Sequence, residues 1–271
     1  MSSRSTLGAS YVFEGIGVHS GERSSVRVSP LAEDAGICFA FGDTRFSIRD
    51  ARYAETRRRT SIAFPGGQIL GTVEHLLASL VGLGIDDALI EARPGSEIPI
   101  LDGSALPFAE RFAEDVTEKN EPAKFTDLPA PVCVEDGASS LVALPSRELR
   151  IIYVIDYPGT SVGTEMKDVT ITPESFMRDV APARTFGLES EVEALRLAGL
   201  ARGASADNAI TIDSRSGKPA YRLENECAAH KILDLLGDSA LAGSPIRAHY
   251  ICVRGGHDLH SRLVNRLRVY A

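Results

Sequence analysis

The sequence carries three short segments whose side chains could bind a metal ion or transfer a proton. They are TVEH at residues 72–75, HKILDLLGD at 230–238 and GGH at 255–257. Residues four apart lie on one face of a helix, so a helix would align His230, Asp234 and Asp238. Imidazole and carboxylate groups both bind zinc, and a catalytic zinc has three protein ligands and one open position. His75 is the natural candidate for the third ligand, and Glu74 would be a carboxylate near the metal that need not bind it.

Each segment also has an ordinary structural interpretation. An HxxxD pair on a helix is usually a surface pair. A lone histidine in an apolar helix, such as His75, is more often a core residue with its hydrogen bonds satisfied, and His257 after two glycines fits a turn. Taken together, the spacing indicates a metallohydrolase but leaves these structural roles open.

The elements that must position these side chains are predicted from apolar patterning. In the first half we expect strands and helices in mixed order: strands near 11–13, 25–28 and 36–39, a helix over 73–83, a strand at 88–91 and a helix from about 108. The second half repeats this order: strands at 141–144 and 149–155, a helix at 189–198, a strand at 209–212, a helix at 224–236, a strand at 248–253 and a helix at 260–269. This predicts an α+β protein of two similar packed domains.

The boundary between the halves is predicted within residues 118–131, EKNEPAKFTDLPAP, which are charged and contain three prolines. The expected domains are 1–124 and 125–271. The length of 271 residues suits two domains of ordinary size.

Composition excludes several classes of protein. A net charge of -8 argues against a nucleic-acid partner. No apolar run approaches a membrane span, and the first residues lack the apolar stretch of a signal peptide, so we expect a cytoplasmic protein. The four widely spaced cysteines are expected to be free thiols, mostly packed. Arg57–Arg59 is interpreted as a solvated turn, with an anion-binding patch as the alternative.

Longer motifs resemble the UDP-3-O-acyl-N-acetylglucosamine deacetylase family of lipid A synthesis. They occur in the family's order and cover nearly the whole chain: GIGVHSG (15–21), TVEHLLASLVGLGIDD (72–87), EIPILDGSALPF (97–108), ARTFG (183–187), GLARGASADNAI (199–210), RLENE (222–226), HKILDLLGD (230–238) and GGHDL (255–259). The resemblance implies hydrolysis of an N-acetyl group on an acylated UDP-amino-sugar.

The resemblance also implies one catalytic Zn²⁺ with three protein ligands, matching His75, His230 and Asp234. Glu74 matches the family's general base and Thr185 its oxyanion-stabilising hydroxyl. These roles suit amide hydrolysis, in which zinc polarises the carbonyl and acidifies a water molecule while a base removes the water's proton.

Further residues match catalytic or substrate-binding positions of the family. His257 matches a histidine that acts as a cation or acid, and Asp238 matches its carboxylate partner, which favours the imidazolium. Lys231 matches a lysine beside the zinc histidine and the substrate. Phe186 and His19 match positions assigned to the sugar nucleotide.

The family's fold implies that each domain layers a sheet against helices, with the active site between the domains. Each domain carries an insert, expected here within 49–66 and 157–178. The second insert is expected to form a hydrophobic passage for the acyl chain, with four apolar candidates: Val162, Met166, Val169 and Ile171. No obligate protein partner is implied, and peripheral membrane contact would suit an acylated substrate.

The sequence departs from the family pattern at several positions: Ala229 replaces a basic residue, Ala204 a glycine, His260 an asparagine, and Tyr157–Gly159 a His-Pro pair. None of these changes removes an expected catalytic group. One alternative is a related zinc deacetylase for another N-acetylated sugar nucleotide or sugar lipid. A non-catalytic nucleotide-sugar binding module is a second alternative, against which the intact set of hydrolytic residues argues.

Overall fold

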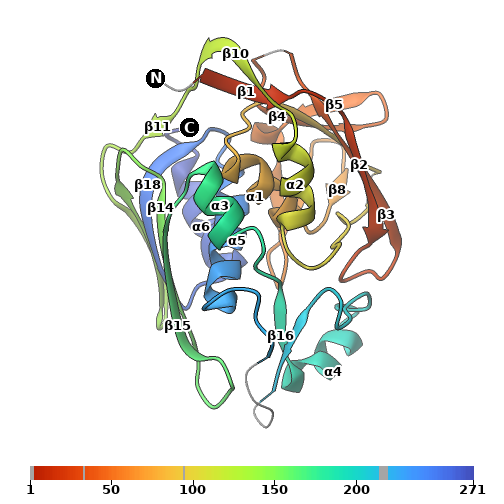
Figure 1. The fold of residues 1–271 in the computed structure, drawn as a ribbon, viewed down its shortest axis with the longest axis vertical. Helices are drawn as coiled ribbons and strands as arrows, with labels where there is room; N and C mark the ends of the chain where they lie inside the picture. The colour runs from red at the N-terminus through yellow and green to blue at the C-terminus, as the bar shows by residue number, and fades with distance from the viewer. Residues whose placement is uncertain (1–2, 33, 94, 214–218) are drawn as a thin grey trace.

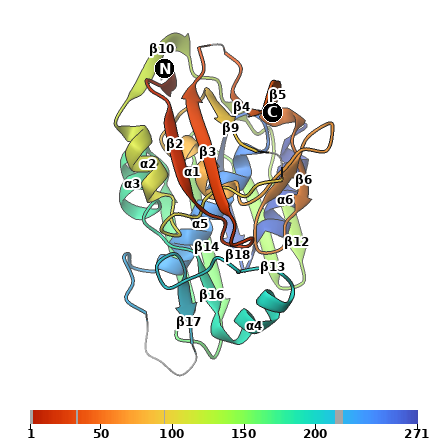
Figure 2. The same cartoon turned by 90° about the vertical axis from the view of Figure 1, so that its right-hand side faces the viewer.

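A computed structural model describes residues 3–32, 34–93, 95–213 and 219–271. Two β-sheets form the outer layers, and most of the helices lie between them (Figure 1). A small unit that contains helix α4 projects at one end of the molecule (Figures 1 and 2).

The first sheet has five strands in the order β2-β3-β9-β4-β5. β9 is parallel to β4 and antiparallel to β3, and the other pairs are antiparallel hairpins. The strands are β2 (Tyr11–Ile16), β3 (Arg23–Pro30), β4 (Ile37–Phe41), β5 (Thr44–Ser47) and β9 (Ala88–Glu91). A 3₁₀ turn, η1 (Ile48–Asp50), follows β5.

The second sheet has the main order β12-β13-β18-β14-β15, and a short strand, β11 (Thr126–Asp127), also pairs with β18. β18 is parallel to β14 and antiparallel to β13. The strands are β12 (Val132–Asp136), β13 (Ser139–Pro145), β14 (Arg150–Tyr157), β15 (Gly163–Thr170) and β18 (Ile246–Val253).

The two sheets therefore share one topology. In each sheet, two hairpins lie on either side of a strand that comes later in the chain, β9 or β18. This strand runs parallel to the first strand of the second hairpin, β4 or β14. A helix precedes that later strand and another follows it: α1 (Glu74–Gly82) and α2 (Leu106–Ala113) around β9, and α5 (Glu226–Ala240) and α6 (His257–Leu267) around β18. The α+β class is confirmed, and the repeated order of elements is real at the level of topology.

Each half also carries extra elements between its second hairpin and the next sheet-flanking helix. In the first half these are three short strands that form their own sheet, β6 (Arg52–Glu55), β7 (Ser61–Ala63) and β8 (Ile69–Leu70). In the second half they are α3 (Pro173–Asp179), β16 (Phe186–Leu188), α4 (Glu189–Leu197) and β17 (Ile210–Ile212). β16 and β17 form a separate parallel pair.

The range 157–178, expected as the second insert, includes a strand of the main sheet. β15 pairs with β14 along its whole length. Of the four apolar residues expected to line a passage, Val162 and Val169 are buried in the core, and Ile171 packs partly buried against it. Met166 is 57% exposed, so it alone of the four has most of its surface available to a ligand.

The segment predicted as a linker contains strands. β10 (Val116–Pro122) pairs antiparallel with the N-terminal β1 (Ser3–Leu7), and β11 lies a few residues further on. Nearly every residue of β10 is exposed, so the segment lacks the alternation of apolar residues that reveals a half-buried strand. The domain boundary at residue 124 stays a prediction.

The structure also describes the cysteines and the Arg57–Arg59 turn. All four cysteines are free, and three of them are buried, as expected. Among the described residues, no helix combines the length and apolar character needed to cross a membrane. In the turn at Arg57–Arg59, Arg58 forms an ion pair with Glu191 of α4 at 2.7 Å, and Arg59 forms one with Glu55 at 2.9 Å.

A buried ion pair fixes the N-terminal strand against the first sheet. Asp87 is fully buried and accepts two hydrogen bonds from the Arg4 guanidinium, at 2.6 and 2.7 Å, and one from Lys119 at 2.8 Å. Burial alone would raise the pKa of Asp87, but hydrogen bonds from Arg4, Lys119 and the Gly36 amide hold it below its ordinary value. The ionised carboxylate therefore stabilises the fold above its unfolded pKa, and this contribution is lost as pH falls through the folded pKa.

We expect Asp87→Asn to lower the free energy of unfolding by about 3–5 kcal/mol, because it removes the fully buried negative charge that Arg4 and Lys119 share, although Arg4 keeps its ion pair with Asp34 at 2.7 Å. Denaturant unfolding at neutral pH measures this loss. Asp168→Asn is the matched control, since it removes the partner of Arg150 in a solvent-exposed pair and should change stability far less. Equal losses in the two variants would contradict the role given to Asp87.

Candidate metal centre and active site

The site lies where α1 begins and α5 passes through the middle of the molecule. The two helices pack on each other between the sheets. A β-carbon at Gly237 would lie only 2.0 Å from the Glu74 carbonyl oxygen, so glycine is required for this close approach. The contact brings the start of α1 against the face of α5 that carries His230, Asp234 and Asp238.

His75, His230 and Asp234 converge as the sequence predicts. Each offers a ligand atom, and these atoms all lie within 4.8 Å of one another. Oδ1 of Asp234 is 3.4 Å from Nε2 of His230 and 4.0 Å from Nε2 of His75. All three side chains are buried.

Neighbouring groups orient these donors. Nδ1 of His230 lies 3.0 Å from the Ala183 carbonyl oxygen and must donate a hydrogen bond to it. The lone pair of Nε2 is therefore free to bind a metal. Lys231 donates to Oδ2 of Asp234 at 2.8 Å. Oδ1 of Asp234 and Nδ1 of His75 are buried and have no hydrogen-bond partner among the described residues. A buried carboxylate oxygen without a donor is the arrangement that a cation would satisfy.

The protonation states also suit a metal. Burial, and then the neighbouring His230, lower the pKa of His75 to about 3, and burial lowers the pKa of His230. Although burial opposes ionisation of Asp234, Lys231 and the surrounding histidines hold its pKa well below the ordinary value. Neutral imidazoles and an ionised carboxylate are the forms that bind Zn²⁺. The residues present therefore fit the predicted metal.

Glu74 lies beside this group. Its side chain is buried, Oε2 accepts a hydrogen bond from the Thr60 amide at 3.2 Å, and Oε1 is 3.9 Å from Nε2 of His257. Burial raises the pKa of Glu74 to about 8, opposed by the nearby His257. A carboxylate with a raised pKa can hold a proton during a reaction at neutral pH.

His257 and Asp238 form a second buried pair. Nδ1 of His257 is 2.8 Å from Oδ2 of Asp238, and Nε2 points toward Glu74 and Asp234, at 3.9 and 3.7 Å. Burial alone would lower the pKa of His257, but Asp238, Asp234 and Glu74 raise it to about 9. His257 in turn lowers the pKa of Asp238 to about 2 against the effect of burial. The pair presents a cation next to the candidate base.

Two side chains that the sequence did not indicate complete this network. The Thr60 hydroxyl donates to Oδ1 of Asp238 at 2.6 Å and lies 3.1 Å from Nδ1 of His257. His260 places Nδ1 2.8 Å from Oδ2 of Asp238. Thr60 has no recognisable motif around it, because its partners lie 178 and 197 residues further along the chain. His260 could have been found from its position three residues after His257 on a helix.

Phe186 and Lys231 lie together beside the metal group. Lys231 Nζ is 5.4 Å from the centre of the Phe186 ring, which also packs edge-to-face on Tyr157 and His230. Thr185 is fixed through its backbone, donating to the Gly103 carbonyl and accepting from the Ile210 amide, both at 2.8 Å. Its neighbour two positions earlier, Ala183, supplies the carbonyl that orients His230.

His19 is buried in a contact between the two halves of the chain. Its Nδ1 accepts from the Ala201 amide at 3.4 Å, and its carbonyl accepts from the Arg202 amide at 3.2 Å. Glu97, which sequence reasoning also missed, accepts hydrogen bonds from the His19 amide at 3.0 and 3.2 Å. These contacts explain the position of His19 structurally, and its role toward substrate stays a prediction.

Each helix of the site is preceded by a residue other than glycine with a positive φ. The values are 55° for Thr72 before α1, for Asn225 before α5 and for Arg254 before α6. This conformation is uncommon outside glycine, and for β-branched Thr72 it is an outlier. The Thr72 hydroxyl donates to Glu97 at 2.6 Å, which helps to hold the strained turn. Such strain is concentrated at functional sites.

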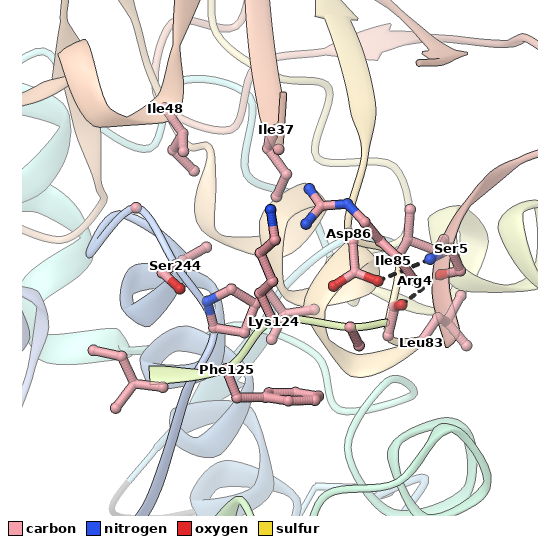
Figure 3. A pocket seen from close by; sticks show the side chains of 18 of the residues that line it. Arg4, Ser5, Ile37, Ile48, Leu83, Ile85, Asp86, Lys124, Phe125 and Ser244 are labelled. Atoms are coloured by element: carbon pink, nitrogen blue, oxygen red, sulfur yellow. Dashed lines mark hydrogen bonds between the residues drawn. The ribbon is translucent and has the colours of Figure 1, made fainter. Parts of the chain in front are cut away.

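A separate cavity of about 600 Å³ opens between the C-terminal ends of α1 and α5. Figure 3 shows its apolar side chains, among them Ile37, Ile48 and Phe125, with Asp86 and Lys124 beside them. None of the predicted catalytic or metal-binding residues lines this cavity.

The chain is similar in sequence to known proteins over nearly its whole length. The UDP-3-O-acyl N-acetylglycosamine deacetylase family model matches residues 4–269. A protein named UDP-3-O-acyl-N-acetylglucosamine deacetylase from Phenylobacterium zucineum is 36% identical over 271 aligned residues, covering 97% of this chain and 92% of that protein. Proteins with the same name from Leptospira biflexa and Thermosynechococcus vestitus are 37% and 36% identical. They align with 94% and 97% of this chain, and with 86% and 93% of their own lengths.

Proposed function

Because the chain belongs to the UDP-3-O-acyl N-acetylglycosamine deacetylase family, we propose that it hydrolyses the N-acetyl group of a UDP-3-O-acyl-N-acetylglucosamine. The products are acetate and the free amine, and the reaction belongs to lipid A biosynthesis. The observation that carries this proposal is the buried donor set of His75, His230 and Asp234 with its unpartnered carboxylate oxygen, beside which a second buried acid, Glu74, shares the neighbour His257 with Asp234.

The three donors would hold one Zn²⁺, which when bound supplies a Lewis acid for the amide carbonyl and acidifies a water molecule. Glu74 takes the proton of the attacking water as the oxygen–carbon bond forms. The Thr185 hydroxyl is proposed to donate to the oxyanion, and a donor of this kind contributes about 3–4 kcal/mol in known enzymes. The carbon–nitrogen bond then breaks, and the leaving amine takes a proton from His257 or from Glu74.

Lys231 has a supporting place in this scheme. Its ammonium group is tied to Oδ2 of Asp234, so it fixes the carboxylate that faces the metal position. The same group lies over the Phe186 ring. Together, these two side chains form a charged and aromatic wall next to His230, which suits recognition of a nucleotide-sugar.

The acyl chain is proposed to lie near the β16–α4–β17 unit and the exposed Met166. Asn225, just before α5, donates to the Met166 carbonyl at 3.1 Å, so this part of β15 lies beside the start of the helix that carries the site. Turnover of the acylated substrate is expected to exceed that of UDP-N-acetylglucosamine. Equal turnover would favour a deacetylase for another N-acetylated sugar nucleotide. Cytoplasmic location and peripheral membrane contact stay predictions.

Metal removal tests the first part of the proposal. We expect the purified protein to bind about one Zn²⁺ per chain, because three protein ligands are the usual set of one catalytic zinc. Chelation should abolish acetate release, and added Zn²⁺ should restore it. His75→Ala should lose both metal and activity because it removes one donor of three. His249→Ala, a change at a half-buried histidine on β18, is the matched control and should keep both.

Metal content measured by atomic emission separates the outcomes. If His75→Ala retained the full metal content, the assignment of the donor set would be wrong. If wild-type protein carried the metal but released no acetate from the acylated substrate, the substrate assignment would fail while the metal site stood.

A further inference from the structure

We propose that His260 is a positioning residue for the deacetylation reaction: it holds the Asp238 carboxylate in the one orientation that directs His257 toward the reacting groups. The inference rests on the proposed function for its catalytic consequence. Its structural part, the hydrogen bonding of His260, can be tested without activity.

The Asp238 carboxylate is held by three side chains. Oδ2 is 2.8 Å from Nδ1 of His257 and 2.8 Å from Nδ1 of His260, and Oδ1 accepts from the Thr60 hydroxyl at 2.6 Å. Asp238, Thr60 and His260 are each 0% exposed. With contacts on both oxygens and no water access, the carboxylate has little freedom to rotate.

The direction of each hydrogen bond follows from the chemistry of the groups. An ionised carboxylate only accepts, so both imidazoles present Nδ1–H to Asp238. A neutral His260 carries one proton, which leaves Nε2 as an acceptor. The Tyr153 hydroxyl lies 3.0 Å from that nitrogen and donates to it. The result is a continuous buried chain from Tyr153 through His260 and Asp238 to His257.

The helix places the two histidines for this purpose. His257 and His260 are one turn apart near the start of α6, so both side chains face Asp238 on α5. Their rings pack at 75° with centres 5.7 Å apart. A single carboxylate thereby fixes the first turn of α6, which carries His257, against the helix that carries His230 and Asp234.

His260 acts through Asp238, because its two ring nitrogens contact the Asp238 carboxylate and the Tyr153 hydroxyl. It is Nε2 of His257 that approaches Glu74 and Asp234. If Oδ2 of Asp238 lost its second donor, the carboxylate could turn and His257 would lose its fixed direction. Replacing partners that orient the groups of a metal site typically lowers activity about 10–100-fold.

Two amide variants separate positioning from simple space filling. His260→Asn keeps a donor at the place of Nδ1, facing Asp238, whereas His260→Gln keeps a polar group at the place of Nε2, facing Tyr153. We expect kcat of His260→Gln to fall about 10–100-fold with a much smaller change in KM, and kcat of His260→Asn to stay within about threefold of wild type. Both variants should retain the metal.

The result that would overturn the proposal is equal kcat for the two folded variants, whether both are high or both are low. Unfolding temperature and metal content report folding. If His260→Gln does not fold, His260→Leu takes its place, since it too removes the donor to Asp238.

A second measurement does not depend on turnover. Nitrogen-15 NMR of the histidine rings should show His260 protonated at Nδ1 and unprotonated at Nε2, and Tyr153→Phe should shift only the Nε2 signal strongly. A proton on Nε2 with a bare Nδ1 would refute the hydrogen-bond assignment. If this pattern holds but the wild type releases no acetate, the proposed function fails and the structural role of His260 remains.

Discussion

Glu74→Gln is expected to keep the metal and lower kcat for acetate release by about 10²–10⁴-fold, the usual cost of removing a positioned general base. The carboxamide has the same shape as the carboxylate but cannot accept the proton of water. Glu74 lies beside the metal donors, not among them, and one of its oxygens accepts from the Thr60 amide. Metal content and kcat, measured on the same preparation, check both halves of this expectation.

Glu97→Gln is the matched control for Glu74→Gln. Glu97 is also a buried glutamate next to a site segment, but its acceptors serve His19, Ser20 and Thr72. The Glu97→Gln variant should lower the free energy of unfolding but change kcat little. If Glu74→Gln lost the metal together with its activity, Glu74 would have to be reassigned as a ligand.

The helix row of His230, Asp234 and Asp238 was predictable because it depends on local periodicity alone. The predicted helix, 224–236, ended too early, and α5 continues to Ala240. The four-residue spacing still placed the three side chains on one face. Residue type made His75 the candidate third ligand, but no spacing rule places it against this row, and the family resemblance supported the choice.

The start of α6 shows where local reasoning failed. The prediction began this helix at residue 260 and left His257 in a turn, because Gly255 and Gly256 resemble a loop. In the structure Gly256 is the N-cap and His257 is the first helical residue. With the helix begun three residues late, His257 and His260 no longer appear as neighbours on one face, so their shared contact with Asp238 was not predicted.

Other features depend on contacts that no local pattern encodes. Thr60 meets Asp238 and His257 because the segment between β6 and β7 reaches α5 and the first residue of α6. Similarly, β10 is a strand because β1 supplies its hydrogen bonds from more than a hundred residues away. Its own sequence is polar and mostly exposed, so periodicity gives no signal.

The pH dependence of kcat/KM is the second large effect expected. The reaction needs Glu74 unprotonated and His257 protonated, so the profile should be a bell. The basic limb should lie above the ordinary histidine value of 6.5, because Asp238 and its neighbours raise the pKa of His257 to about 9 despite burial. Burial raises the pKa of Glu74 and thus the acid limb, while a bound dication would move that limb back to lower pH.

Two variants identify the group whose deprotonation produces the basic limb. Asp238→Asn removes the strongest interaction that favours the imidazolium, so activity should be lost at lower pH than in wild type. His257→Gln cannot donate a titrating proton, so its basic limb should flatten while the acid limb stays. Because the groups are coupled, each apparent pKa belongs to the site as a whole. If the basic limb were unchanged in His257→Gln, the titrating group would be Lys231 or the nucleophilic water. His257 would then not act as the cation.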